Sequence, residues 1–362
     1  MVPLPAQGPA GEEMGDLTES LWRLPKAELH QHLDGSLRPE TAVELAAAIG
    51  LNISLEDAKQ RMVAPPRCAN QAELLTYFDL PIALLQTDTA LRRAAVELVV
   101  TLAEERVRYA EIRWAPRLHL ERGLGIGAVI EAVAQGIEDA MDRLGSSAPA
   151  VSLIVTAMRS HPPAANVLLA REAAIFGEPV VGFDLAGLEA EWPAPPHAAA
   201  FLAAAEGGLK LTVHAGEVAG SEHIREALDL GATRIAHGVT AIDDTELVEE
   251  LKRRDVTLDM CPTSNVQAGI VPDLAQHPLV RLHRLGVSVT CSTDDRVVSN
   301  TNLSDELARS ATRLGLTRQE LTAIALNAFR RGFGPRLVLD RLLREAEQEW
   351  STWATEVTDQ LS

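Results

Sequence analysis

Two histidines stand one residue apart in the segment AELHQHLDG, residues 27–35. In an extended strand, side chains two positions apart point to the same face, so His30 and His32 would present two imidazoles together. Neighbouring imidazoles suit a metal ion, but two ligands do not complete a site. The remaining ligands have to come from other segments of the chain.

Further histidines and acids stand where other apolar segments end. His214 and Glu217 close the segment LTVHAGE, and His237 closes TRIAHG. Asp294 and Asp295 close VTCSTDD. Three imidazoles and one carboxylate form a nitrogen-rich ligand set suited to zinc, with a position left for water. Such an ion lowers the pKa of its water toward neutrality, so we expect a hydrolytic metal site.

The residues beside these ligands suggest how protons would move. Glu217 lies three residues beyond His214, close to the expected metal but not needed as a ligand. A carboxyl group in this place is suited to donate a proton to a substrate nitrogen. His237 and Asp295 are then free to orient or to deprotonate the water. The segment VVGFDLAG, residues 180–187, offers no lysine that could bridge two ions, so a single metal is expected.

Eight short apolar segments alternate with amphipathic stretches, and these segments are the expected strands. They span residues 26–32, 108–116, 151–158, 180–187, 210–217, 232–239, 256–262 and 287–295. Alternating strands and helices predict parallel pairing with right-handed crossovers, and eight such units fit an α/β fold of the (β/α)8 barrel type. In such a barrel, active-site groups sit at the carboxyl ends of the strands, which is where the residues named above fall.

The chain is expected to form one domain over residues 21–362. A leader over residues 1–20, which contains several Pro, Gly and Glu residues, is expected to be disordered. Residues 36–107 form an insertion between the first two strands, with helical spacing and enough length for a lid over the barrel mouth. Two helical segments are expected to close the C-terminal end.

The composition disfavours several classes of partner. The formal net charge of −18 argues against nucleic acid polymers and anionic membrane surfaces, whereas a small neutral ligand is compatible with it. No apolar run reaches the roughly 20 residues that a membrane span needs. The cysteines Cys68, Cys261 and Cys291 are too few for a disulfide framework, so a cytoplasmic location is expected. The oligomeric state stays open.

The other histidines carry no such pattern. They are expected at the surface or in loops: His119, His161, His197, His223, His277 and His283. Asp184, inside the segment GFDLAG, fits a structural role and a functional role equally well.

The segments that carry these residues resemble the adenosine deaminase family of the amidohydrolase superfamily. The resemblance rests on six blocks in that family's order and spacing: LPKAELHQHLDGSLRPET, VVGFDLAG, LTVHAGEVAGSEHIREAL, GATRIAHGV, CPTSNVQAG and STDDRVVSNTNLSDE. The similarity runs from about residue 22 to residue 335. It implies a zinc-dependent barrel enzyme that deaminates a 6-aminopurine nucleoside by hydrolysis.

The resemblance also implies a role for each site residue. One zinc ion per chain would be held by His30, His32, His214 and Asp294. Glu217 would protonate N1 of the purine, and hydroxide would add at C6 with the assistance of His237. Ammonia would then leave, which yields the 6-oxopurine.

Contacts to the nucleoside follow from the same resemblance. Asp34 would hydrogen-bond the ribose 5′-hydroxyl, Gly187 would offer its backbone N–H to N3, and Asp295 would contact the N7 side and the attacking water. The chain departs from the family pattern at Leu188 and Arg296. Both residues are expected near the substrate pocket, where they would affect substrate preference rather than chemistry.

Adenosine and 2′-deoxyadenosine, converted to inosine and 2′-deoxyinosine, are the leading substrates. The family also contains deaminases of larger 5′-substituted adenosines such as 6-aminodeoxyfutalosine of menaquinone biosynthesis. Asp34 favours a free 5′-hydroxyl, whereas the insertion could make room for a larger group, so both alternatives stay open.

Other classes of function fit less well. Two-metal amide or lactone hydrolysis lacks its lysine, and the cytidine deaminase type lacks the P-C-x-x-C motif. A barrel reused as a binding module would have lost a ligand or Glu217, and all of these residues are present.

Overall fold

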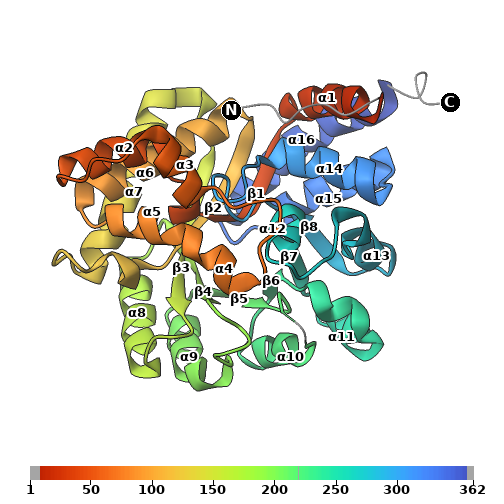
Figure 1. Ribbon diagram of the computed structural model, residues 1–362. Coiled ribbons are helices and arrows are strands. Elements are labelled where there is room, and N and C mark those ends of the chain that lie inside the picture. The colour runs from red at the N-terminus through yellow and green to blue at the C-terminus, as the bar shows by residue number, and fades with distance from the viewer. Residues whose placement is uncertain (1–8, 219, 357–362) are drawn as a thin grey trace.

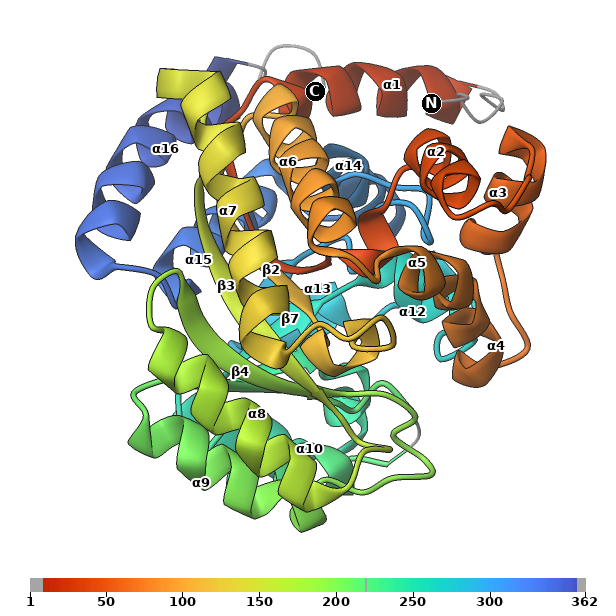
Figure 2. The same ribbon diagram turned by 90° about the vertical axis from the view of Figure 1, so that its left-hand side faces the viewer.

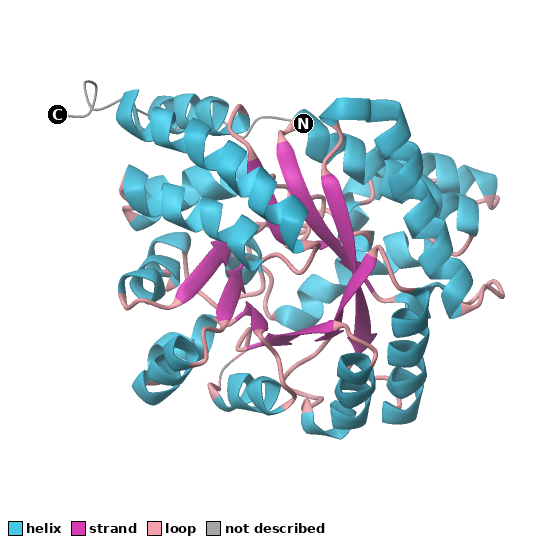
Figure 3. Cartoon of the chain, turned by 180° about the vertical axis from the view of Figure 1, so that it is seen from behind, coloured by secondary structure: helices cyan, strands magenta, loops and turns pink. Residues whose placement is uncertain are grey.

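Eight parallel strands, paired in sequence order, form the centre of the fold (Figures 1 and 3). The computed structural model describes residues 9–218 and 220–356. The strands are β1 (Lys26–His32), β2 (Val107–Trp114), β3 (Ala150–Met158), β4 (Val180–Ala186), β5 (Lys210–Ala215), β6 (Arg234–His237), β7 (Thr257–Met260) and β8 (Ser288–Cys291). Each begins within two residues of its predicted segment, and the expected (β/α)8 barrel is confirmed.

The first and last strands meet at residues that the sequence singles out. Just beyond β8, the backbone N–H of Asp294 donates to the carbonyl of His30 at 3.0 Å. The backbone N–H of His32 donates to the carbonyl of Asp294 at 2.7 Å. These two bonds join the ends of the sheet, so the seam of the barrel passes through the candidate site.

Eight helices form the outer ring, and one of them comes after each strand. They are α6 (Asp88–Glu104), α7 (Ile126–Leu144), α8 (Pro163–Phe176), α9 (Ala198–Glu206), α10 (Glu222–Asp229), α11 (Thr245–Arg253), α13 (Leu279–Arg284) and α15 (Arg318–Arg331). Several begin at side-chain caps: Thr87 and Asp244 accept hydrogen bonds from backbone N–H groups three residues further on. Helix α15 packs on β1 and β8, outside the seam.

Most of the insertion lies on one side of the barrel and reaches across its mouth (Figure 2). Its helices are α2 (Pro39–Ala48), α3 (Leu55–Met62), α4 (Gln71–Leu75) and α5 (Asp79–Leu84). Just before α4, the backbone N–H of Cys68 donates to the carbonyl of Gln267, the last residue of α12 (Pro262–Gln267), at 2.7 Å. Helix α6 packs on α7 and β2, so this last helix of residues 36–107 belongs to the ring.

The chain is helical over α1 (Pro9–Trp22), where composition predicts a disordered leader. Residues 1–8 of that leader lie outside the described residues. Met14 and Leu17 pack against the core from α1, and Ser20 accepts a hydrogen bond from the Trp353 indole at 2.8 Å. These partners lie far away in the sequence, on α14 (Leu303–Leu314) and α16 (Arg336–Glu356), so local composition does not reveal them.

Within the described residues, no helix combines the length and the apolar character needed to cross a bilayer. Cys68, Cys261 and Cys291 are buried and form no disulfide.

Arg296 points into the protein interior, whereas the sequence led us to expect this residue near the substrate pocket. Its guanidinium group donates to the buried carboxylates of Glu28 and Glu105, and its Nε donates to Gln31 at 3.1 Å. A buried cation with two carboxylate partners ties the sequence after β8 to β1 and to the end of α6. Arg296 is therefore a structural residue.

We expect Arg296→Leu to lower the free energy of unfolding by about 3–5 kcal/mol, because Glu28 and Glu105 would lose their buried guanidinium partner and only Lys26 would remain as a cation near Glu105. Urea denaturation followed by circular dichroism measures this loss. Arg341→Leu is the control, since Arg341 and Glu345 form a solvent-exposed pair at 4.0 Å, and its unfolding midpoint should not change. Equal midpoints for the two variants would contradict the structural role of Arg296.

Candidate active site

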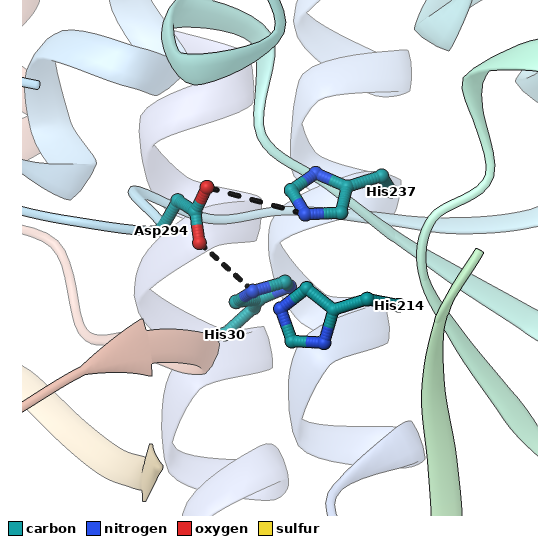
Figure 4. A group of neighbouring side chains, drawn as sticks. All are labelled: His30, His214, His237 and Asp294. Atoms are coloured by element: carbon teal, nitrogen blue, oxygen red, sulfur yellow. Dashed lines mark ion pairs between the residues drawn. The ribbon is translucent and has the colours of Figure 1, made fainter. Parts of the chain in front are cut away.

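Four histidines and one aspartate meet at the carboxyl ends of the strands. Figure 4 shows three of these histidines, His30, His214 and His237, around Asp294. They come from β1, β5 and β6 and from the turn after β8: His30, His32, His214, His237 and Asp294. All except the partly exposed His32 are buried. The structure thus brings His30, near the start of the chain, next to Asp294, which follows the last strand.

The distances between side-chain atoms fit a shared metal ion. Asp294 Oδ1 lies 2.9 Å from His30 Nε2 and 3.4 Å from His32 Nε2. His32 Nε2 lies 3.2 Å from His214 Nε2. Ligand atoms held about 2.0–2.1 Å from one tetrahedral zinc ion are roughly 3.3 Å from one another. The three observed separations match this spacing.

The hydrogen bonding of His30 supports the same conclusion. Among the described residues, neither ring nitrogen of His30 has a hydrogen-bond partner, although Asp294 Oδ1 is close. Burial holds the pKa of His30 well below its usual range and lowers the pKa of His32 to about 3. Both rings are therefore neutral, which is the form of imidazole that binds a metal. Buried lone pairs that converge without donors fit a cation between them.

Asp184 orients the ring of His214. Its carboxylate lies 3.0 Å from His214 Nδ1, which places the ring proton on Nδ1 and the lone pair on Nε2. Although burial opposes ionisation, His214 and Arg113 hold the pKa of Asp184 well below its usual range. Thr156 also donates to this carboxylate at 3.2 Å. Of the structural and functional roles that the sequence left open for Asp184, this contact favours the functional one, because Asp184 orients a candidate ligand.

The two carboxylate oxygens of Asp294 have different partners. Ser264 donates its hydroxyl to Oδ2 at 2.7 Å, while Oδ1 faces His30 and His32. His237 Nε2 lies 4.0 Å from Oδ2. Both His237 and Asp294 have positive φ angles, 70° and 64°, a conformation that costs residues other than glycine free energy and recurs at functional sites.

Proximity alone permits a second ligand set. One group of possible ligand atoms within 4.8 Å of one another consists of His30, His214, His237 and Asp294. His32 falls in another group with Asp294 and Asp295. The contacts of His32 at 3.2 and 3.4 Å are closer to ligand spacing than the 4.0 Å contact of His237.

Glu217 is a buried carboxyl group next to this cluster. Burial and the charge of Asp294 raise its pKa to about 8, so it carries a proton at neutral pH. Gln71, on α4 of the insertion, donates its amide N–H to Glu217 Oε2 at 2.5 Å. The carboxylate of Glu189 accepts the backbone N–H groups of residues 216–218 at 2.7–3.0 Å and thereby holds the loop that carries Glu217.

The three expected nucleoside contacts lie on the same rim. Asp295 is buried, with one carboxylate oxygen that lacks a partner among the described residues. Burial and the neighbouring Asp294 raise the pKa of Asp295 well above its usual range. Asp34 follows β1, and burial raises its pKa to about 6. Gly187 directly follows β4 and has a φ of +114°, a conformation that L side chains rarely adopt.

Sequence reasoning missed several residues of this site. Ser264 and Glu189 stand within or beside the blocks CPTSNVQAG and VVGFDLAG, so their position offered a signal. Gln71 stands in no motif. The expectation that the isolated histidines lie at the surface or in loops is wrong for His119 and His197, which are buried in short helical turns. His277 lies in a loop as expected, but it is also buried.

Comparisons with known proteins agree with this geometry. Residues 25–348 match the family model described as adenosine deaminase. An adenosine deaminase of Clostridium perfringens is 38% identical over 319 residues, which cover 87% of this chain and 95% of that protein.

Solved structures of deaminases share the fold. The adenine deaminase of Arthrobacter aurescens has a TM-score of 0.83 and 27% identity and covers 90% of this chain and 98% of its own. The N6-mAMP deaminase of Arabidopsis has a TM-score of 0.82 and 28% identity, with 91% and 99% covered.

We expect His214→Ala to lose most of its bound zinc, because three ligands bind the ion more weakly than four. Metal analysis of protein purified from zinc-supplemented cultures measures the content, which should be about one ion per chain in the unaltered protein. His223→Ala is the control, since His223 lies on α10 and pairs with Glu226. Full zinc occupancy in His214→Ala would show that His214 is not a ligand.

Proposed function

The chain belongs to the adenosine deaminase family, and on that premise we propose that it hydrolyses adenosine and 2′-deoxyadenosine to inosine and 2′-deoxyinosine, releasing ammonia. The observation that carries the proposal is Glu217, a buried and protonated carboxyl group beside a cluster of side chains suited to zinc. Relatives that are 37–38% identical are named adenosine deaminase, whereas the structural neighbours named for adenine and N6-mAMP are 27–28% identical. Three unpaired cysteines favour a cytoplasmic location.

The proposed ligands of one zinc ion are His30, His32, His214 and Asp294. When bound there, zinc would supply a water molecule whose pKa is lowered toward neutrality. Asp184 orients His214, and Ser264 orients Asp294. These two proposed ligands are therefore already oriented before an ion binds.

Glu217 acts as the general acid toward N1 of the purine. Because Gln71 donates to Oε2, that oxygen is an acceptor, and the carboxyl proton is left to Oε1. Transfer of this proton to N1 withdraws electrons from C6 and makes that carbon more electrophilic. Water then adds at C6 through its oxygen, one of its protons returns to Glu217, and the other leaves with the exocyclic amine as ammonia. The water oxygen remains as the 6-oxo group.

The nucleoside contacts are proposed for Asp34, Gly187 and Asp295. The unpartnered oxygen of Asp295 supports a hydrogen bond to substrate, because buried polar atoms are normally paired. Gly187 carries no side chain at the end of β4, which lets a flat purine approach the backbone. A buried acid at Asp34 suits a 5′-hydroxyl and disfavours a 5′-phosphate, which repels a carboxylate.

We expect Glu217→Gln to retain zinc and to lose about 10²–10⁴-fold in kcat, because an amide can donate a hydrogen bond to N1 but cannot transfer a proton. The change in ultraviolet absorbance when adenosine is deaminated is a suitable assay. Glu222→Gln, at the exposed start of α10, should keep the original kcat. A near-normal kcat in Glu217→Gln would refute the general-acid role.

Substrate preference is tested by comparing kcat/KM across a panel of 6-aminopurines. The panel contains adenosine, 2′-deoxyadenosine, adenine, 5′-methylthioadenosine, N6-methyl-AMP and 6-aminodeoxyfutalosine. We expect the first two to give the highest values. A lead of about tenfold by any other compound would overturn the proposed substrate while leaving the deaminase chemistry intact.

A further inference from the structure

A chain of buried hydrogen bonds leads from α13 to the candidate site through a residue that sequence reasoning had set aside. The backbone N–H of Leu279 lies 3.3 Å from His277 Nδ1. His277 Nε2 lies 3.1 Å from Asn265 Oδ1. Asn265 Nδ2 lies 3.1 Å from His237 Nδ1. All three side chains are at most 2% exposed.

The direction of every bond in this chain follows from its first donor. A backbone N–H can only donate, so His277 Nδ1 must be the acceptor. His277 is neutral, because burial lowers its pKa to about 3, and its ring proton is therefore on Nε2. That proton requires an acceptor, which orients the Asn265 amide with its oxygen toward His277. The amide nitrogen of Asn265 then donates to His237 Nδ1.

This direction fixes the proton on the ring of His237. Because Nδ1 accepts a hydrogen bond, the proton of the neutral ring is on Nε2. Nε2 faces Glu217 Oε2 at 3.7 Å and Asp294 Oδ2 at 4.0 Å, both beyond hydrogen-bond distance. The chain thus ends in a donor directed at the place where the reaction occurs.

A second buried pair shows how a purely structural arrangement differs. Asn166 Nδ2 lies 3.0 Å from His197 Nδ1, as Asn265 does from His237. There, however, His197 Nε2 lies 3.1 Å from the backbone carbonyl of Arg159, so its donor is satisfied within the protein. The open donor is the feature that sets His237 apart from His197.

We propose that Asn265 and His277 are positioning residues that hold His237 in its Nε2–H form. In this form His237 donates a hydrogen bond to the oxygen of the attacking water, and it continues to do so after that oxygen has bonded to C6. It does not take the proton of that water, and with Nε2 protonated it cannot be a ligand of the metal. Of the two roles that the sequence left open for His237, orienting the water is therefore the one supported. The inference rests on the proposed function for the identity of the reaction.

The protonation of His237 can be read directly from ¹⁵N NMR of the zinc-loaded wild-type protein, because protonated and unprotonated ring nitrogens resonate far apart. His237→Gln identifies the signals by their disappearance. We expect Nε2 to carry the proton and Nδ1 to carry none. A proton on Nδ1 would overturn the inference. The spectrum needs no turnover, so it stands even if adenosine proves not to be the substrate.

Asn265→Asp tests the effect on the reaction. A carboxylate can only accept here, so it would take a hydrogen bond from His237 Nδ1 and leave Nε2 with a lone pair. We expect kcat to fall by about 10²-fold or more with KM little changed, as a reversed histidine tautomer impairs catalysis in serine proteases. If His237 were instead the base, a free lone pair on Nε2 would maintain or raise kcat, and that outcome overturns the inference.

Two further comparisons separate positioning from stability. Asn166→Asp places the same carboxylate in the matched pair with His197, and it should keep kcat while costing similar stability. His277→Leu removes the donor to Asn265 and should lower kcat about tenfold, whereas His277→Gln keeps an N–H donor and should restore most of it. Equal kcat values for the two His277 variants would contradict the role of the chain.

Discussion

The convergence of imidazole nitrogens on one carboxylate oxygen in a buried place is the constraint on which this structure depends. His30, His32 and His214 lie so close to Asp294 and to one another that their side-chain atoms could hold a metal ion. Their rings must be neutral and correctly turned for this to work. Much of the polar interior has that task, because Asp184 turns His214 and Ser264 takes up the second oxygen of Asp294.

The same burial divides the acids of the site into two kinds. Asp184 stays ionised because His214 and Arg113 lie against it. Glu217 and Asp295 have raised pKa values, since they are desolvated and lie near the charge of Asp294. A single desolvated rim thereby holds ionised carboxylates and protonated carboxyl groups together. Residue types alone do not distinguish these roles, because position and neighbours determine them.

The barrel was predictable because its strands alternate with helices and end in reactive residues. This pattern is visible in short segments of the sequence. The role of Gln71 was not predictable, because its hydrogen-bond partner Glu217 is 146 residues away in the sequence. His277 was set aside because an isolated histidine has no local partner, and its contact with Asn265 arises from tertiary packing. The helix α1 and the inward course of Arg296 were missed for the same reason, as their apolar and acidic partners come from distant segments.

The seam between β1 and β8 has a consequence for how the protein is made. The first two imidazoles leave the ribosome early, whereas the aspartate that lies against them is synthesised only after seven more strands. A nascent chain therefore exposes His30 and His32 before the aspartate that lies against them has been synthesised. In the proposed site the set of ligands is complete only after the last strand has been synthesised, and a truncated translation product that ends before Asp294 lacks one proposed ligand.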